Sequence, residues 1–285
     1  MDVEDPEIPA RLYLDLIKKC LTRHVFPDHS YRPTTRPGLR PHPLAWAAYP
    51  LVDRVFAPLG LTLCCYAPFD AEKRAEGTDW PAEADTMVGL KRLDNLQNCI
   101  TEVLRKSIPG DLIETGVWRG GATIFMRAVL KAYGDRTRCV WVADSFEGLP
   151  RPDGRYQQDD GDPHWTFKSV LGVSRDQVKA NFARYGLLDD QVRFLAGWFK
   201  DTLPAAPITR LAVLRLDGDM YSSTMDALRS LYPKLSPGGY TIVDDYGGTS
   251  GCRAAVDDFR ASCKITEQLE WIDWTGVFWE KRADP

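Results

Sequence analysis

Short apolar runs alternate with segments of helical spacing through the second half of the chain. Apolar runs of about five residues bounded by Gly, Pro or Asp are typical of buried strands, and apolar residues three or four positions apart are typical of helices. This alternation predicts an α/β fold with a parallel sheet and crossover helices. The predicted strands are 111–115, 139–143, 192–196, 211–216 and 240–243. The predicted helices between them are 121–132, 175–185, 223–235 and 250–262.

The last part of the chain, residues 265–281, is rich in β-branched and aromatic residues. Thr275 and Gly276 provide a turn within it, so we expect two closing strands there. Such strands are typical of an α/β sheet that has an antiparallel edge.

The first part of the chain has the spacing of helices. Residues 11–23 place leucines and an isoleucine on one side of a helix, and residues 87–107 do the same over a longer stretch. Asp85 or Thr86 can cap the second of these helices, because both side chains accept hydrogen bonds from free backbone amides.

Proline interrupts the segment between these two helices. Five prolines fall between residues 27 and 43, which predicts a loop. Residues 44–66 are apolar and aromatic but are broken by Pro50 and Pro58, so one or two short helices are expected. This segment is either a wall or lid over a substrate, or a dimer contact, or a plain packing appendage.

Composition places the chain among soluble globular proteins. It has 285 residues, of which 44% are hydrophobic and 27% are charged. We expect an amino-terminal helical or lid region with the proline-rich insert, residues 1–108, and a core domain, residues 109–285. The 36 basic and 40 acidic residues give a net charge of −4, which favours neither nucleic acid nor an anionic membrane. A small-molecule partner is therefore expected.

The sequence also indicates a cytoplasmic protein. Its amino terminus is acidic and lacks an apolar signal core, and no run approaches the roughly 20 apolar residues that a membrane span needs. The seven cysteines form no Cys-x-x-Cys pair, which disfavours a zinc site or a disulfide framework.

Two acidic turns follow two of the predicted strands. Asp217 and Asp219 follow one apolar run, and Asp244 and Asp245 follow the next. Four carboxylates at one sheet edge would repel one another, so a positive group is expected among them. Mg²⁺ is the simplest candidate, because it takes oxygen ligands and keeps positions open for water or substrate. The alternative is that these residues are helix N-caps and turn residues.

A glycine turn lies where the first strand of the core gives way to a helix. Such turns let backbone amides and a helix amino terminus approach a ligand closely. Glycines stand at 116, 120 and 121, so the dinucleotide pattern Gly-x-Gly-x-x-Gly is absent. Glu114 would repel a pyrophosphate and attract an amino group or a sulfonium, which favours S-adenosylmethionine over NAD. The alternative is that Gly120 and Gly121 only permit close packing of helix on strand.

Asp144 follows the second strand of the core, about 30 residues after the glycine turn. An acidic residue at this point suits the two ribose hydroxyls of an adenosyl ligand. Alone it could equally be a turn residue, but Glu114 and the glycine turn favour the ligand-binding interpretation.

These segments, taken in order, resemble the macrocin O-methyltransferase family, whose members methylate small molecules in antibiotic pathways. The resemblance rests on LYLDLIKKCL, MVGLKRLDNLQ, GDLIETGVWRGGATIFMRAVL, VWVADSFEGLP, LRLDGDMYSST and YTIVDDYG. It covers nearly the whole chain and departs mainly in the proline-rich insert, residues 33–69. It implies a Rossmann-like class I methyltransferase sheet of seven strands, S-adenosylmethionine as donor, Mg²⁺ at the acidic turns, and a homo-oligomer, most simply a dimer.

The resemblance also implies roles for particular residues. The cofactor-binding residues are Met87, Val88, Gly89, Glu114, Thr115, Gly116, Asp144, Ser145 and Phe146. Those around Glu114 match contacts to the methionine end, those from Asp144 match the ribose and adenine edge, and those from Met87 match a helix start beside the cofactor. The metal ligands are Asp217, Asp244 and Asp245, and the general base is Asp219, or Asp217 if the two roles are reversed.

The expected function is Mg²⁺-dependent methyl transfer from S-adenosylmethionine to a hydroxyl of a small natural product. A deoxysugar hydroxyl of a glycosylated antibiotic is preferred on the resemblance, with a phenol or catechol as the alternative acceptor. A metal-dependent glycosyltransferase remains a second alternative, because it also uses an Asp-x-Asp turn. Aromatic residues that could stack on an acceptor are Trp118, Trp165, Trp198 and Tyr246. His164 is a further candidate, either as a substrate contact or as a second base.

Overall fold

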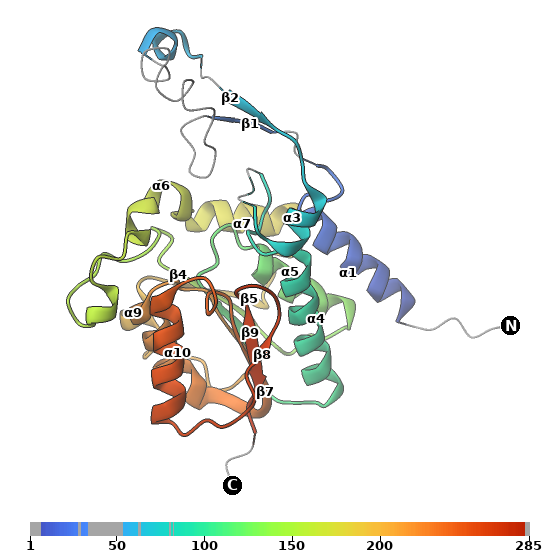
Figure 1. Ribbon diagram of the computed structural model, residues 1–285. Helices are drawn as coiled ribbons and strands as arrows, with labels where there is room; N and C mark the ends of the chain where they lie inside the picture. The colour runs from blue at the N-terminus through green and yellow to red at the C-terminus, as the bar shows by residue number, and fades with distance from the viewer. Residues whose placement is uncertain are drawn as a thin grey trace, which may run out of the picture.

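A seven-stranded sheet forms the centre of the molecule, in the order β5-β4-β3-β6-β7-β9-β8 (Figure 1). The computed structural model describes residues 7–27, 30–33, 54–61, 64–79, 81 and 83–282. The strands of the sheet are β3 (Asp111–Thr115), β4 (Val140–Asp144), β5 (Val192–Ala196), β6 (Leu211–Leu216), β7 (Leu235–Val243), β8 (Glu270–Trp271) and β9 (Val277–Glu280). β3 to β7 are parallel, whereas β9 runs antiparallel to both β7 and β8. The predicted α/β fold with an antiparallel edge is confirmed.

Helices cover both faces of this sheet. The α-helices of the described residues are α1 (Ile8–Leu21), α3 (Ala71–Glu76), α4 (Leu90–Arg105), α5 (Gly121–Ala132), α6 (Lys168–Leu171), α7 (Arg175–Arg184), α8 (Phe199–Thr202), α9 (Tyr221–Leu231) and α10 (Ser250–Ser262). Short 3-10 turns occupy Ala57–Leu59, Gln157–Asp159, His164–Phe167 and Tyr232–Lys234. No helix among the described residues has the length and apolar character that crossing a membrane requires.

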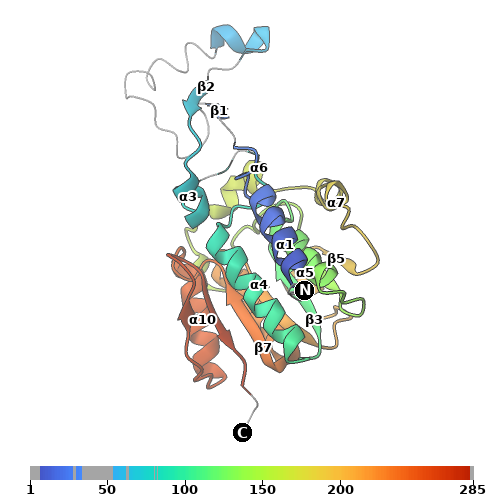
Figure 2. The same cartoon turned by 90° about the vertical axis from the view of Figure 1, so that its right-hand side faces the viewer.

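Two hydrophobic cores lie on opposite faces of the sheet. Along β4, Val140 and Val142 belong to the core under α1, α4, α5 and α7, and Trp141 and Ala143 belong to the core under α9 and α10. This alternation follows from the two-residue period of a strand. Figure 2 shows α1, α4 and α5 side by side over one face of the sheet.

Helix α4 begins later than predicted. Its N-cap is Gly89, and neither Asp85 nor Thr86 caps it. The Asp85 carboxylate is taken by the side chains of Arg184 and Tyr185, both at 2.7 Å. The cap prediction was therefore wrong. The side chain of Asp85 is occupied by partners about 100 residues away in the chain, which local spacing cannot reveal.

Helix α9 begins two residues earlier than predicted, at Tyr221. The carboxylate of Asp159 accepts hydrogen bonds from the backbone amides of Tyr221 at 2.8 Å and Ser222 at 3.0 Å. Asp159 belongs to a distant loop and is buried. This remote cap satisfies amides that a helix start leaves free, so the helix extends beyond its local signals.

Two short strands precede the sheet in sequence and form a separate ribbon. β1 (Ser30–Pro33) pairs antiparallel with β2 (Cys64–Ala67), and the ribbon projects from the body (Figure 1). The loop prediction for residues 27–43 is wrong over β1, because proline is tolerated at the end of a strand in a two-stranded ribbon. Residues 34–53 lie outside the described residues, and with them most of the proline-rich insert.

Candidate functional site

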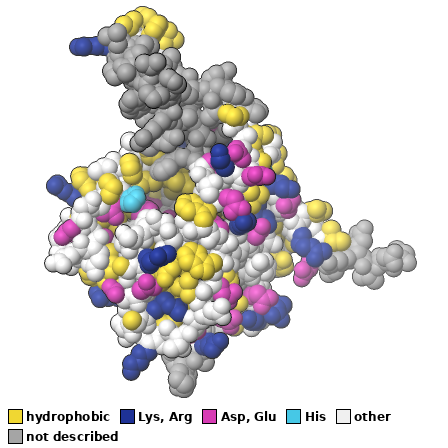
Figure 3. Space-filling view, viewed as in Figure 1, with side chains coloured by type: hydrophobic (Ala, Val, Ile, Leu, Met, Phe, Trp, Pro, Cys, Tyr) yellow, Lys and Arg dark blue, Asp and Glu magenta, His cyan; other side chains and the backbone are white. Residues whose placement is uncertain are grey.

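A cavity of about 890 Å³ opens at the carboxyl ends of the parallel strands. The residues predicted from sequence that line it are Met87, Val88, Glu114, Gly116, Asp144, Ser145, Asp217, Asp219, Asp244 and Asp245. The structure thus brings the candidate cofactor residues and both acidic turns to one space. Gly89, Thr115 and Phe146 lie beside it in the chain without lining it. Figure 3 shows acidic and basic side chains interspersed over one face of the molecule, without a continuous basic patch on the described part of that face.

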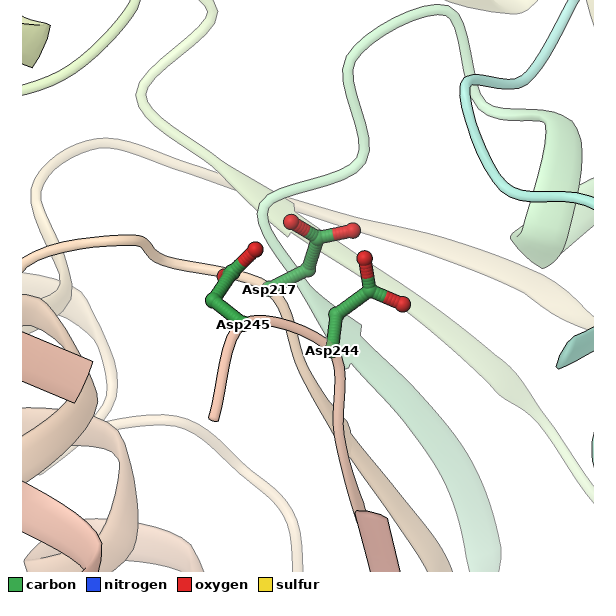
Figure 4. Close-up of side chains that lie close together, drawn as sticks. All are labelled: Asp217, Asp244 and Asp245. Atoms are coloured by element: carbon green, nitrogen blue, oxygen red, sulfur yellow. The ribbon is translucent and has the colours of Figure 1, made fainter. Parts of the chain in front are cut away.

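The acidic turns converge because β6 and β7 are neighbouring parallel strands that end at the same level. Carboxylate oxygens of Asp217, Asp244 and Asp245 all lie within 4.8 Å of one another (Figure 4). Asp219 lies two residues after Asp217 in the same turn, and its backbone amide donates to Asp245 Oδ2 at 3.0 Å. Its φ of 55° is in the left-handed region, which Asp and Asn tolerate better than most residues.

Burial and the neighbouring carboxylates disfavour the ionised forms of Asp217, Asp219 and Asp245. Burial, followed by the charge of Asp244, raises the pKa of Asp217 well above its usual value. Burial and the charges of Asp219 and Asp217 do the same to the pKa of Asp245. Burial raises the pKa of Asp219 to about 6, although the charge of His164 lowers it. Such a cluster favours a bound cation, which would restore the ionised state.

Arg215 is the main functional residue that sequence reasoning missed. It stands in β6 directly opposite Glu114 of β3, and only 2% of its surface is exposed. Its guanidinium pairs with Glu114, with Asp244, and with Asp217 at 2.9 Å. These three carboxylates raise the pKa of Arg215 even though burial disfavours its charge. The signal in the sequence was a charged residue inside an otherwise apolar strand, LAVLRL.

Arg92 is a second cation that was not predicted. It lies in the first turn of α4, where its guanidinium pairs with Asp244 and, at 2.6 Å, with Asp273. Two arginines therefore supply part of the positive charge that the acidic turns require. Carboxylates still outnumber guanidinium groups in this cluster, which comprises Glu114, Asp217, Asp219, Asp244, Asp245, Asp273, Arg92 and Arg215.

Glu114 offers a binding group for a positively charged ligand. Its Oε1 pairs with Arg215, whereas its buried Oε2 has no hydrogen-bond partner among the described residues. Burial raises the pKa of Glu114 to about 7, against the lowering effect of Arg215. A buried carboxylate oxygen without a partner is costly, so a donor on a ligand in the cavity would stabilise it.

Asp144 organises the glycine turn. Its Oδ2 accepts from the amide of Val117 at 2.7 Å, and its Oδ1 accepts from the amide of Phe146 at 2.7 Å. Burial raises the pKa of Asp144, and these amide bonds partly offset that rise. A carboxylate has about four acceptor positions, so ligand hydroxyls can still bind it.

The glycine turn and the first acidic turn touch through their backbones. Gly116 has a φ of 85°, and a Cβ atom there would lie 1.6 Å from the carbonyl oxygen of Asp217. We expect Gly116→Ala to lower the free energy of unfolding by at least about 2 kcal/mol, from strain at positive φ and from the clash. Urea denaturation measures this loss.

Gly154→Ala is the matched control for that substitution. Gly154 has a similar φ of 77°, but a Cβ atom there meets nothing within 4 Å. Gly154→Ala should lower the free energy of unfolding only by the strain of a positive φ, without a contribution from a clash. Equal losses for the two variants would contradict the close approach of the two turns.

Aromatic and polar side chains form the rest of the cavity wall. Trp118 and Trp198 line it, as does His164. The Trp165 ring is not part of the wall and lies under the guanidinium of Arg151, 5.4 Å from it. Tyr246 lines a separate, smaller cavity.

The residues present fit both groups that the sequence predicts. Three carboxylates whose oxygens lie close together are a donor set that Mg²⁺ accepts, since it prefers oxygen ligands. The unpartnered Oε2 of Glu114 fits an amino group. At the glycine turn, a Cβ atom on Gly120 would lie 2.8 Å from Val178 and one on Gly121 would lie 2.4 Å from the carbonyl oxygen of Asp85, so these two glycines permit close packing.

Known proteins with this sequence pattern are O-methyltransferases. The family model described as Macrocin-O-methyltransferase (TylF) matches residues 10–281. The chain is 52% identical, over 95% of its length and 93% of the relative's, to 8-demethyl-8-(2,3-dimethoxy-alpha-L-rhamnosyl)-tetracenomycin-C 4'-O-methyltransferase of Streptomyces olivaceus. It is 44% identical, over 98% of its length and 99% of the relative's, to mycinamicin III 3''-O-methyltransferase of Micromonospora griseorubida.

A solved structure agrees with these matches. The structure of the O-methyltransferase NovP superposes with a TM-score of 0.82 at 46% identity, covering 96% of this chain and all of that one. The sheet is thus that of a Rossmann-like class I methyltransferase, and the glycosyltransferase alternative is not retained. The chain belongs to the macrocin O-methyltransferase family and is an O-methyltransferase enzyme.

Proposed function

We propose that this enzyme transfers a methyl group from S-adenosylmethionine to a deoxysugar hydroxyl of a glycosylated natural product, with Mg²⁺ as a cofactor. The observation that supports it most is the single cavity shared by Glu114, the glycine turn and the two acidic turns. The preference for a sugar hydroxyl follows the names of two relatives, which describe methylation at a 4' position of a rhamnosyl compound and at a 3'' position.

The cofactor would lie along the glycine turn. Glu114 Oε2 would accept from the amino group of the methionine end, and Asp144 with Ser145 would bind the ribose. Met87 and Val88 line the cavity just before α4 and would pack against the adenosyl group. Gly89, Thr115 and Phe146 do not line the cavity, and they would hold their lining neighbours Val88, Gly116 and Ser145 in position.

Asp217, Asp244 and Asp245 would hold Mg²⁺. When bound, the ion would supply positive charge that stabilises a developing alkoxide and would help to orient the acceptor. Arg215 and Arg92 fix the Asp244 carboxylate from two sides, and so define its position before any ligand enters. This fixed geometry lowers the cost of ordering the site on binding.

Asp219 would act as the general base. Its carboxylate takes the proton of the acceptor hydroxyl as the oxygen attacks the methyl carbon, the new C–O bond forms, and the C–S bond breaks with its electron pair going to sulfur. Burial raises the pKa of Asp219 to about 6, which brings it closer to the neutral range that suits a general base. Most of the rate gain should come from positioning, because the sulfonium already activates the methyl group.

Methyl transfer can be measured with radiolabelled S-adenosylmethionine and an aryl α-L-rhamnoside that has free hydroxyls. We expect labelled rhamnoside, complete loss of labelling with EDTA, and recovery when Mg²⁺ is added in excess. Catechol serves as the comparison acceptor. Labelling of catechol alone would favour the phenol alternative, and full activity in EDTA would overturn the metal assignment.

A further inference from the structure

The turn between β8 and β9 carries a tryptophan that lies exposed on the cavity wall. Trp274 lines the cavity, and 53% of its surface is exposed. An aromatic ring in this position leaves apolar surface in water, which a ligand with an apolar face can cover. Neither the cofactor contacts nor the metal ligands proposed above account for Trp274.

The indole ring of Trp274 is held in place by two neighbours. Its Nε1–H donates to the carbonyl of Glu76, the last residue of α3, at 3.1 Å. The Arg92 guanidinium lies over the ring, 5.8 Å from the ring centroid. That guanidinium also pairs at 2.6 Å with Asp273, which precedes Trp274 in the chain. A ring held in this way loses little freedom on contact with a ligand, which lowers the cost of binding.

The turn that bears Trp274 is joined to the second acidic turn. The hydroxyl of Thr275 donates to the carbonyl of Asp244 at 2.7 Å, and the amide of Gly247 donates to the carbonyl of Thr275 at 2.8 Å. Arg92 contacts both the Asp244 carboxylate and the Trp274 ring. A molecule that places one group at the acidic turns can therefore cover the ring with the part that lies next to that group.

We propose that Trp274 is a specificity-determining residue that stacks on the aglycone of a glycosylated acceptor and favours flat, aromatic aglycones. This inference rests on the proposed function, in which the sugar hydroxyl lies at the acidic turns. The aglycone is bonded to that sugar and so lies next to it. Aromatic rings that stack on one another gain more than the burial of their area alone provides, which favours an aromatic aglycone over an aliphatic one. Trp274 takes no part in the chemistry, and its contact helps to orient the acceptor.

The test uses the labelled-methyl assay with two acceptors that share the sugar, an aryl α-L-rhamnoside and methyl α-L-rhamnoside. The wild-type enzyme should favour the aryl compound about tenfold in kcat/KM, the size expected of one aromatic contact. Trp274→Ala should lower kcat/KM for the aryl compound about tenfold and leave that for the methyl compound within about twofold. Trp274→Phe keeps a ring without the N–H donor, so it should retain most of the preference.

Trp271→Ala is the matched control. Trp271 lies in the same hairpin and is 54% exposed, but it does not line the cavity. Its loss should leave the ratio of the two kcat/KM values unchanged. If Trp274→Ala shows no cooperative thermal unfolding, Trp274→Leu replaces it, because leucine keeps apolar bulk without a ring. The greater part of the preference should again be lost.

Three results would overturn the role of Trp274: equal kcat/KM of the wild-type enzyme for the two rhamnosides, a preference that survives in the Ala or Leu variant, or an equal loss for both rhamnosides. The last result would indicate a purely structural role or a contact with the sugar alone. If the wild-type enzyme labels neither rhamnoside, the proposed function fails, and this inference fails with it. The two failures are therefore distinguishable.

Discussion

Asp219→Asn is expected to lower kcat by about 10²–10⁴-fold while S-adenosylmethionine binding is retained. Asparagine has nearly the same shape and tolerates the left-handed φ of 55° at this position, so the turn should keep its conformation. It cannot take up a proton, which removes the base. Single-turnover methyl transfer and isothermal titration with S-adenosylmethionine measure the two quantities separately.

Asp217→Asn distinguishes the two roles in the first acidic turn. If Asp217 is a metal ligand, its loss should weaken Mg²⁺ activation, and higher Mg²⁺ should recover part of the activity. Asp219→Asn should show no such recovery. Wild-type kcat in Asp219→Asn would reject it as the base, and the opposite pattern of recovery would mean that the two roles are reversed.

Arg215→Met is expected to reduce the free energy of unfolding by about 3–5 kcal/mol at neutral pH, because it leaves buried carboxylates without their cation. Glu114 and Asp217 would lose their guanidinium partner, whereas Asp244 keeps Arg92. Urea denaturation at several pH values measures the change.

The difference in the free energy of unfolding between Arg215→Met and the wild-type protein should shrink as pH is lowered from about 8 to 6. Burial already raises the pKa of Glu114 to about 7 in the presence of Arg215, and loss of that arginine raises it further. A carboxyl whose pKa is raised on folding favours the folded state at low pH and opposes it as pH rises through the folded pKa.

Arg92→Met is the matched control, since Arg92 does not pair with Glu114. The loss in the free energy of unfolding caused by Arg92→Met should not change with pH near 7. Equal stability of Arg215→Met and the wild-type protein across this range would show that the buried network does not support the fold.

Local pattern predicts much of this structure. The strands β3, β5 and β6 and the helices α5 and α10 begin and end where the apolar runs and the helical spacing place them. The candidate site residues from Glu114 onward lie at the carboxyl ends of β3, β4, β6 and β7 or in the turns that follow, and parallel strands bring these ends to one sheet edge. The sequence therefore predicts which acidic residues meet in the cavity.

Long-range partners account for what could not be predicted. Arg215 reads as an isolated charge in an apolar strand, and its function becomes evident only when β3 and β7 place Glu114 and Asp244 beside it. The cap that Asp159 provides to α9 spans 62 residues of sequence. The spacing of apolar residues contains no information about such pairs, because each depends on how separate segments pack.

The backbone contact between Gly116 and Asp217 also bears on how such enzymes diversify. Gly116 cannot accept a Cβ atom without displacing the carbonyl group of Asp217, so substitution at Gly116 is under strong constraint. Another part of the cavity wall comes from the segment 148–171, which consists of loops and short helical turns, where exchange of side chains is tolerated. New acceptors can therefore be accommodated during evolution by changes in that wall, while the machinery for methyl transfer is inherited unaltered.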